Sequence, residues 1–247
     1  MFDSTIGRST VLMPFGGEFL KNFTTVLTQG LKAAGGIPVW VMMANSLVMA
    51  LGIAIGKIAI SITAAYAIVY FRFPGRELCF VLIFITLMMP VEVRIVPTFQ
   101  VAANLNFIDS YLGLVLPLIA SATATFLYRQ MFMTIPAELL EAARIDGAGP
   151  WRFFVDVVLP LSRTNTAALF VVLFIYGWNQ YLWPLLVTNQ ESMYTIVMGI
   201  QRMVNIPDAV PEWNLIMAVA LLGMLPPLLV VLGMQKLFVR GLVETEK

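Results

Sequence analysis

Long apolar stretches separated by short polar segments dominate the pattern of the chain. A helix needs about 20 apolar residues to cross a lipid bilayer. Five stretches approach or exceed that length, at 39–70, 78–91, 110–128, 164–186 and 213–235. The second is short, and it spans only if its helix continues past Glu92 and Arg94 towards Val101. The pattern therefore predicts an all-α, polytopic transmembrane helical bundle with five spans.

Prolines lie inside these spans or at their ends, at Pro90, Pro117, Pro184 and the pair Pro226-Pro227. Each proline removes a backbone N–H donor and favours a kink in its helix. A packed bundle tolerates such kinks because neighbouring helices satisfy the freed carbonyl groups. We therefore expect kinks in several of the spans.

Composition narrows the class of protein. Hydrophobic residues make up 60% of the 247 residues and charged residues 12%, whereas soluble domains carry about 25% charged residues. There is no histidine and only one cysteine, Cys79, which excludes imidazole catalysis, histidine-ligated metal and an internal disulfide. A net charge of +1 argues against a nucleic-acid partner. We expect a protein that sits in a lipid bilayer and has no catalytic residue, cofactor or metal site.

The basic residues between the spans predict which side of the membrane each segment faces, because cytoplasmic loops are enriched in Lys and Arg. Alternate loops divide these residues nine to five. The larger set is Arg72, Arg76, Arg129, Arg144, Arg152, Arg163, Lys236, Arg240 and Lys247. This division places the segment 136–161 and the tail 242–247 in the cytoplasm, and the N-terminal segment 1–38 and the loop 189–212 outside. The transmembrane domain between them is 39–241.

This orientation requires the segment 1–38 to cross the membrane with no helix before it. A preceding span explains the crossing more easily than translocation of a free tail. We therefore expect a sixth helix upstream of Met1 in the natural protein.

The polar segment 136–161 stands out between two long apolar stretches. Residues 137–145 are good helix formers, and the sequence Asp-Gly-Ala-Gly-Pro at 146–150 ends that helix. Residues 151–158 predict a second short helix, which Pro160 limits. Glu141 and Asp146 could accept hydrogen bonds from a partner, and the small Ala142 and Ala143 permit close approach. The alternative is an ordinary amphipathic connector between two spans.

The same segment resembles the cytoplasmic signature of permease subunits of bacterial binding-protein-dependent ABC importers. The matching residues are Glu141, Ala142, Ala143, Gly147, Leu159 and Pro160, and Val157 stands where Ile is commoner. The resemblance implies a type I ABC importer permease with six spans. It also implies that these residues, with Asp146, couple the chain to an ATPase.

The resemblance further implies the partners of the chain. They are a homologous second permease subunit, two ATP-binding subunits, an extracytoplasmic solute-binding protein and the bilayer of the bacterial inner membrane. The outer loop 189–212 is long enough to contact the solute-binding protein, although it could equally be a solvated connector. ATP hydrolysis would belong to a partner subunit, so the chain itself would be a transport subunit and not an enzyme.

Three further segments resemble the second permease of sn-glycerol-3-phosphate importers. They are Met-Pro-Val-Glu-Val-Arg-Ile at 89–95, Tyr-Gly-Trp-Asn-Gln-Tyr-Leu-Trp at 176–183 and Phe-Val-Arg-Gly-Leu-Val-Glu at 238–244. The resemblance implies import of sn-glycerol-3-phosphate or glycerophosphodiesters by alternating access. Import of a neutral sugar is the alternative.

Three charged residues within or beside the spans are candidates for the substrate pathway. Lys57 lies in the middle of its span, and a lone ammonium in lipid costs about 2.5–3.5 kcal/mol, so it should face the interior of the bundle. It could attract an anionic substrate, or it could pair with a carbonyl group or with Glu92. Arg94 could bind phosphate through two parallel hydrogen bonds, or it could anchor the helix at the membrane interface. Glu92 and Arg94 are two residues apart, so they face different surfaces of a regular helix.

The glycines Gly52 and Gly56, just before Lys57, are spaced by four residues within an apolar span. This spacing predicts a face on which another helix packs closely. It does not match a nucleotide-binding loop, which needs one more residue between the glycines and a Ser or Thr after the lysine.

Two other classes of protein fit the sequence poorly. A secondary transporter driven by ions usually has internal repeats and paired acidic residues within the membrane, and neither is evident here. A membrane enzyme of lipid metabolism would need a cluster of Asp, His or Ser at the interface, whereas the acidic residues of this chain are scattered.

Overall fold

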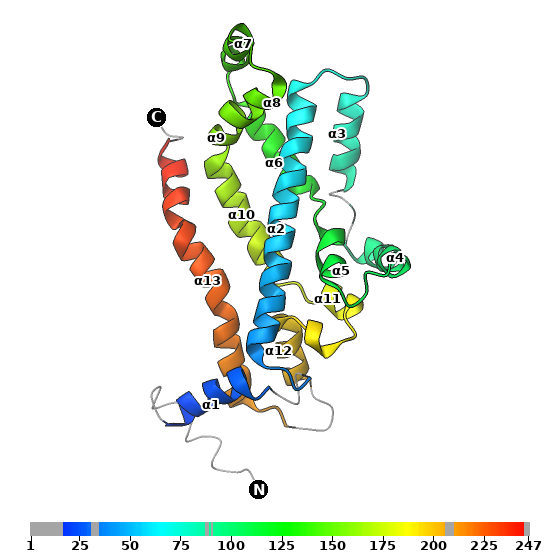
Figure 1. Ribbon diagram of the computed structural model, residues 1–247, viewed down its shortest axis with the longest axis vertical. Helices are drawn as coiled ribbons and strands as arrows, with labels where there is room; N and C mark the ends of the chain where they lie inside the picture. The colour runs from blue at the N-terminus through cyan, green and yellow to red at the C-terminus, as the bar shows by residue number, and fades with distance from the viewer. Residues whose placement is uncertain (1–16, 31–34, 87–88, 90, 206–209, 245–247) are drawn as a thin grey trace.

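The chain forms a bundle of helices, which the computed structural model describes for residues 17–30, 35–86, 89, 91–205 and 210–244 (Figure 1). No strand occurs in these ranges. The α-helices are α1 (Gly17–Thr28), α2 (Val39–Tyr70), α3 (Arg76–Ile85), α4 (Val91–Asn104), α5 (Tyr111–Val115), α6 (Ala122–Met133), α7 (Ala137–Ile145), α8 (Pro150–Phe153), α9 (Leu159–Leu161), α10 (Arg163–Trp178), α11 (Leu182–Val187), α12 (Ile196–Val204) and α13 (Trp213–Glu244). Two 3₁₀ turns, η3 (Leu116–Leu118) and η5 (Glu191–Met193), and one π-helix, η4 (Phe154–Val158), complete the set.

Helices α2 and α13 define the long axis of the molecule (Figure 1). Both run from the end that carries α1 and α12 towards the end that carries α7. Helices α6 and α10 pack along α2, and α10 also packs against α13. The fully buried side chains of Tyr128, Phe132 and Phe174 contribute to the core between these helices. The middle of α2 is therefore surrounded by other helices, as a mid-span lysine requires.

Two of the predicted spans are single helices. Within the described residues, Val39–Tyr70 and Trp213–Gln235 are each long and apolar enough to cross a membrane. These ranges confirm the first and last predicted spans. The helix α13 continues through Pro226 and Pro227, so the pair of prolines does not end the helix.

The third predicted span, 110–128, is a bent pair of helical segments. Residues Tyr111–Leu118 and Ala122–Met133 meet at an angle of 48°. The second segment begins afresh at Ser121, whose side chain accepts a hydrogen bond from the Ala124 backbone N–H at 3.3 Å. An N-cap of this kind satisfies one of the unpaired donors of a helix start. The span therefore has the predicted kink, and its helix extends beyond the predicted end at residue 128.

The fourth predicted span, 164–186, also differs from the prediction at its end. Helix α10 ends at Trp178, and the six residues of α11 form a separate helix after Asn179 to Tyr181. At its start, α10 meets Pro150–Leu161 at an angle of 71°. The predicted end at residue 186 was therefore wrong, because uniform hydropathy conceals a break in backbone direction.

The second predicted span is wrong as a continuous helix. Helix α3 ends at Ile85 and α4 begins at Val91, and neither is long enough to cross a bilayer. The sequence supplies a reason, since Pro90 cannot donate the backbone hydrogen bond that would continue the helix. All residues of α3 are described and none is buried, so α3 lies at the periphery of the bundle.

Gly52 and Gly56 confirm the predicted packing face on α2. A Cβ atom on Gly52 would lie 2.8 Å from Cγ1 of Val115, and one on Gly56 would lie 2.5 Å from Cγ2 of Ile119. Such distances are too short for any side chain larger than hydrogen. The two glycines thus allow the segment from α5 to η3 to lie directly against α2.

The loop 189–212, predicted to lie outside, is more structured than a solvated connector. Its described residues include α12, in which Ile196 and Met198 are fully buried. The side-chain amide of Asn45 on α2 donates to the carbonyl oxygens of Ser192 at 2.7 Å and Tyr194 at 3.0 Å. This part of the loop therefore folds back onto α2.

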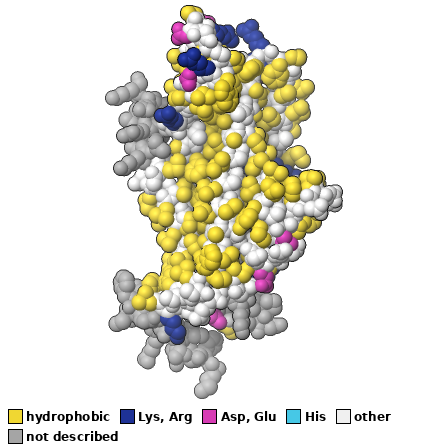
Figure 2. Space-filling model, viewed as in Figure 1, with side chains coloured by type: hydrophobic (Ala, Val, Ile, Leu, Met, Phe, Trp, Pro, Cys, Tyr) yellow, Lys and Arg dark blue, Asp and Glu magenta, His cyan; other side chains and the backbone are white. Residues whose placement is uncertain are grey.

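Figure 2 shows that hydrophobic side chains cover the middle of the visible face, whereas most charged side chains lie towards its two ends. This is the distribution that a bilayer selects. The segment that carries α7 and the C-terminal end of α13 lie at the same end of the molecule (Figure 1), as the alternation of basic loops predicts.

Candidate functional site

Helix α7 has the bounds that the sequence predicts, Ala137–Ile145. Its C-terminus is closed by two backbone hydrogen bonds, from Gly147 N–H to the Arg144 carbonyl at 3.1 Å and from Ala148 N–H to the Ala143 carbonyl at 2.8 Å. This pair of bonds is a Schellman motif, which requires a left-handed residue after the helix. Gly147 supplies it with φ of 71°. The glycine of the signature therefore fixes where the helix stops.

The surface of α7 is unusually open. All nine residues of the helix are described and none is buried. Ile145 is 86% exposed, and Trp151, which follows the turn, is 70% exposed. Glu141 and Asp146 are also exposed, and neither pairs with a basic side chain of the described residues. A helix that offers apolar and acidic side chains together at one end of a molecule is typical of a docking surface.

In contrast to the exposed α7, the segment that follows it has buried aromatic side chains. Phe153 and Phe154 are 2% and 4% exposed. The Phe153 ring meets the Tyr70 ring edge-on at 5.3 Å, and the Phe154 ring lies 4.8 Å from the Tyr66 ring. The Tyr66 hydroxyl donates a hydrogen bond to the backbone oxygen of Pro150 at 2.6 Å. The exposed helix is thus joined to the C-terminal part of α2 through two aromatic contacts and a hydrogen bond.

Leu159 and Pro160 lie further along, in α9, just before the 71° bend into α10. The π-helix η4 precedes them. Pro160 has no N–H to bond to the carbonyl four residues earlier, and its ring crowds that carbonyl, which is a setting in which a π-bulge forms. Ser162 then starts the bend, and its backbone N–H bonds the carbonyls of Val158 and Leu159 at 3.0 and 3.2 Å. The signature residues therefore bracket the segment between α7 and α10 and do not form one cluster.

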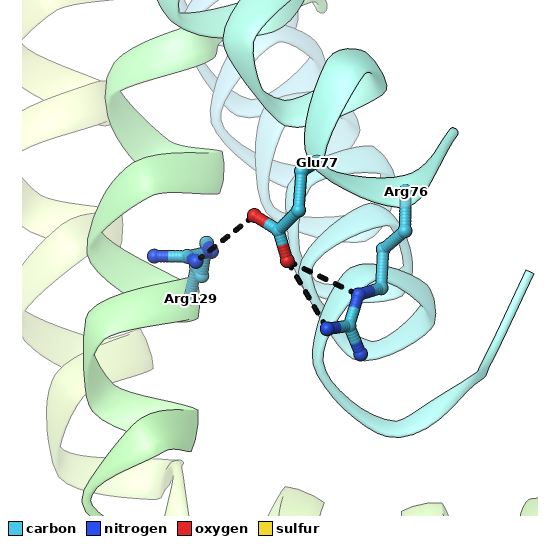
Figure 3. A network of polar contacts seen from close by, with 3 residues as sticks. All are labelled: Arg76, Glu77 and Arg129. Carbon is cyan, nitrogen blue, oxygen red and sulfur yellow. Dashed lines mark hydrogen bonds and ion pairs between the residues drawn. The ribbon is translucent and has the colours of Figure 1, made fainter. Parts of the chain in front are cut away.

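An ion-pair network attaches the peripheral α3 to the bundle near the same end (Figure 3). The Glu77 carboxylate lies 3.1 Å from the Arg76 guanidinium and 3.8 Å from that of Arg129 on α6. The Arg129 guanidinium also lies over the Phe80 ring at 4.1 Å. Glu77 is 64% exposed, so the ion pairs contribute little to stability. These ion pairs instead fix the position of α3 relative to α6.

The charged candidates Lys57 and Arg94 meet at a different place. Both line a cavity of about 110 Å³ that also touches α10 and α11. Lys57 is 7% exposed, and its ammonium lies 3.8 Å from the centre of the Tyr176 ring. Glu92 was the third candidate for the pathway, and its side chain lies outside the described residues. The structure therefore brings together two of the three predicted pathway residues.

Sequence reasoning missed the contacts that Tyr66, Tyr70 and Tyr176 make with the candidate residues. The signal for the first two was a pair of tyrosines four residues apart near the end of a span, a spacing that places both on one face of the helix. Tyr176 had no local signal, because its contact with Lys57 joins residues more than a hundred positions apart.

Comparison with known proteins identifies the family. A model of the family described as "binding-protein-dependent transport system inner membrane component" matches residues 57–244. The chain is 59% identical to the "sn-glycerol-3-phosphate transport system permease protein UgpE" of Agrobacterium fabrum, over 96% of this chain and 83% of the relative. The chain belongs to this family of transport permeases. This permease is also 58% identical to the protein of the same name from Yersinia pestis, over 99% of this permease and 87% of that relative. That from Brucella melitensis is 56% identical over all of the permease and 88% of the relative.

The fold of the permease has a counterpart among solved structures. A chain in the crystal structure of "a bacterial ABC transporter involved in the import of the acidic polysaccharide alginate" superposes with a TM-score of 0.75. The match covers 87% of the permease and 78% of that chain at 21% identity. It confirms the predicted type I importer bundle. Family and fold together make the permease a membrane transport subunit, and not an ion-driven transporter or an enzyme of lipid metabolism.

Proposed function

We propose that this permease is one of two homologous membrane subunits of an importer for sn-glycerol-3-phosphate or glycerophosphodiesters in the bacterial inner membrane. The names of relatives that are 56–59% identical over nearly the whole chain support this substrate. Two copies of an ATP-binding subunit associate from the cytoplasm, and a solute-binding protein delivers substrate from outside. The transmembrane domain is 39–241, with the segment 1–38 outside and the tail 242–247 in the cytoplasm.

The segment 136–161 couples this permease to the ATPase. The observation that carries this proposal is the contrast between the exposed α7 and the buried segment that follows it. An exposed helix at the cytoplasmic end can sit in a cleft of an ATP-binding subunit, where Glu141 and Asp146 accept hydrogen bonds and Ile145 is covered. The small Ala142 and Ala143 allow the partner backbone to approach closely.

Movement of α7 then passes into the bundle by two routes. One is the hydrogen bond from Tyr66 to Pro150, which connects the segment to α2. The other is the chain itself through Leu159 and Pro160, which leads into α10 across the bend of 71°. Since α2 and α10 pack along each other, displacement of α7 tilts both. Rigid-body motion of this kind, driven by ATP-dependent closure of the ATPase pair, switches the pathway between inward and outward access.

The proposal is tested with the complete importer in liposomes, formed from this permease, its partner permease, the ATP-binding subunit and the solute-binding protein. With ATP supplied to the cytoplasmic side, labelled sn-glycerol-3-phosphate should be transported, and a neutral disaccharide should not. Transport of the disaccharide alone would contradict the substrate assignment. Transport without ATP would contradict the ABC mechanism.

A further inference from the structure

The cavity between α2, α4, α10 and α11 carries positive charge that the described protein does not neutralise. Its polar lining groups are Lys57, Arg94, Thr98, Tyr176, Gln180 and Trp183. Apolar walls from Ile95, Pro117, Leu118 and Leu182 complete it. An apolar lining strengthens the interaction of any charge inside with a ligand of opposite sign.

Most hydrogen-bond donors of this cavity are already used. The Trp183 indole N–H donates to the Gly113 carbonyl at 3.0 Å, and the Gln180 amide donates to the Tyr176 carbonyl at 3.2 Å. The Thr98 hydroxyl donates to the Arg94 carbonyl at 2.7 Å. The donors that remain include those of both cationic side chains, the Tyr176 hydroxyl and the second N–H of the Gln180 amide. Among the described residues, no carboxylate or other acceptor bonds the Lys57 ammonium or the Arg94 guanidinium.

Lys57 is held in place without being neutralised. The Tyr176 ring lies 3.8 Å from its ammonium, and a ring face stabilises a cation while leaving its net charge and its N–H donors available. Arg94 is exposed, so it can reorient towards a ligand. Its planar guanidinium matches the geometry of two phosphate oxygens. One buried and one exposed cation thus face a single small space.

We infer that Lys57 and Arg94 form a subsite for the phosphate group of a phosphate monoester on the transport pathway. A phosphate monoester carries about −1.5 to −2 charges at neutral pH, which matches two unneutralised cations better than a singly charged diester does. The volume of about 110 Å³ is somewhat smaller than a 150 Å³ cavity that holds benzene, so it admits a phosphate head but not a whole sugar. This inference rests on the proposed function and specifies which residues contact the substrate within the membrane.

The test uses the complete importer and two measurements. The first is the maximal rate of sn-glycerol-3-phosphate uptake with saturating solute-binding protein, so that delivery does not limit the rate. The second is equilibrium binding of labelled inorganic phosphate to the detergent-solubilised importer without the solute-binding protein. Lys57→Met and Arg94→Gln should each lower uptake about tenfold and weaken phosphate binding by a similar factor, as expected for loss of a charge-assisted hydrogen bond.

Two control variants separate charge from structure. Lys57→Arg keeps the cation and should restore most of the uptake. Arg76→Gln removes a cation on the peripheral α3, outside the cavity, and should leave both measurements unchanged. Complex assembly should be the same in all variants. If the importer with Lys57→Met fails to assemble, the Arg94→Gln variant alone tests the subsite. Arg94 is exposed, so its substitution should not prevent assembly.

Uptake within twofold of the unsubstituted importer in Arg94→Gln or an assembled Lys57→Met would overturn the subsite. So would a Lys57→Arg variant as defective as Lys57→Met, because the charge would then not matter. The two proposals fail in different ways. If the unsubstituted importer binds phosphate through these residues but transports no sn-glycerol-3-phosphate, the subsite is supported and the proposed substrate is wrong. If uptake of sn-glycerol-3-phosphate persists in all variants, the proposed substrate is supported and the subsite is wrong.

Discussion

The hydroxyl of Tyr66 donates a hydrogen bond to the backbone oxygen of Pro150 at 2.6 Å, across 84 positions of sequence. Tyr66 lies near the C-terminus of α2, and Pro150 is the first residue of α8. The bond therefore connects α2, along which α6 and α10 pack, to the exposed segment that carries α7. It is a direct side-chain link between the proposed ATPase contact and α2.

Removing this hydroxyl should weaken coupling without unfolding the protein. Tyr66→Phe keeps the ring and its contact with Phe154 at 4.8 Å but loses one hydrogen bond, which costs about 1 kcal/mol. The melting temperature of the isolated permease should fall by only about 2–4 °C. The number of substrate molecules transported per ATP hydrolysed should fall more clearly, because α2 no longer follows α7 closely. Parallel assays of uptake and ATPase activity measure this ratio.

Tyr70→Phe is the matched control for that experiment. Tyr70 lies one turn further along α2, and its hydroxyl approaches the Phe132 carbonyl at 3.4 Å, a long distance for such a bond. Its removal should leave transport per ATP nearly unchanged. Equal losses in the two variants would show that the Tyr66 bond has no special part in coupling.

Gly147→Val should disrupt the end of α7. Gly147 has φ of 71°, a conformation that costs an L-residue about 1–2 kcal/mol and costs a β-branched residue still more. No atom lies within 4 Å of the added Cβ, so the effect is one of backbone conformation and not of steric clash. Membrane insertion should be normal, while ATP hydrolysis continues without matching uptake. The measurements are the amount of variant in the membrane and the uptake rate per ATP.

The neighbouring Gly149 provides the control for Gly147. It also has open space around its Cβ position, but its φ is −70°, which any residue adopts. Gly149→Ala should therefore transport normally. A defect of equal size in both variants would mean that the turn is sensitive to any side chain and that the left-handed cap is not the cause.

Glu141→Lys should abolish contact with the ATPase while the permease itself folds. Glu141 is exposed and has no ion-pair partner among the described residues, so the fold loses nothing when its charge is reversed. Association with the ATP-binding subunit, measured by co-purification from membranes, should fall sharply. Glu138→Lys, one turn earlier on the exposed surface of α7, tests whether any charge reversal has this effect, and it should co-purify nearly normally.

The sequence predicts a structural feature of this permease well when the residues that determine the feature are close together in the sequence. The bounds of α7 were predicted correctly because good helix formers, Gly147 and Pro150 all lie within one short segment. The span 78–101 was predicted incorrectly because an apolar stretch does not reveal the change of direction between α3 and α4. The break that ends α10 at Trp178 was hidden for the same reason.

Contacts between distant segments are the part that the sequence does not reveal. Lys57 and Arg94 were each suspected from their charge, but their shared cavity depends on how α2, α4 and α10 pack. The Tyr176 ring over Lys57 and the Tyr66 bond to Pro150 likewise arise only when the bundle closes. A charge within a span can thus be recognised as significant from sequence, whereas its partner cannot.

Gly56 gives a test of packing in the bundle that does not depend on transport. A Cβ on Gly56 would lie 2.5 Å from Cγ2 and 2.9 Å from Cβ of Ile119, so η3 would have to move away from α2. Overpacking of this kind costs about 1–3 kcal/mol, which outweighs the gain of about 1 kcal/mol from replacing a helical glycine with alanine. Gly56→Ala should therefore lower the melting temperature. Gly233→Ala on α13, where no atom lies within 4 Å of the new Cβ, should raise it slightly or leave it unchanged. In a double-mutant cycle, Ile119→Ala should be less harmful in the Gly56→Ala background than alone, and strictly additive losses would show that the two helices do not meet there.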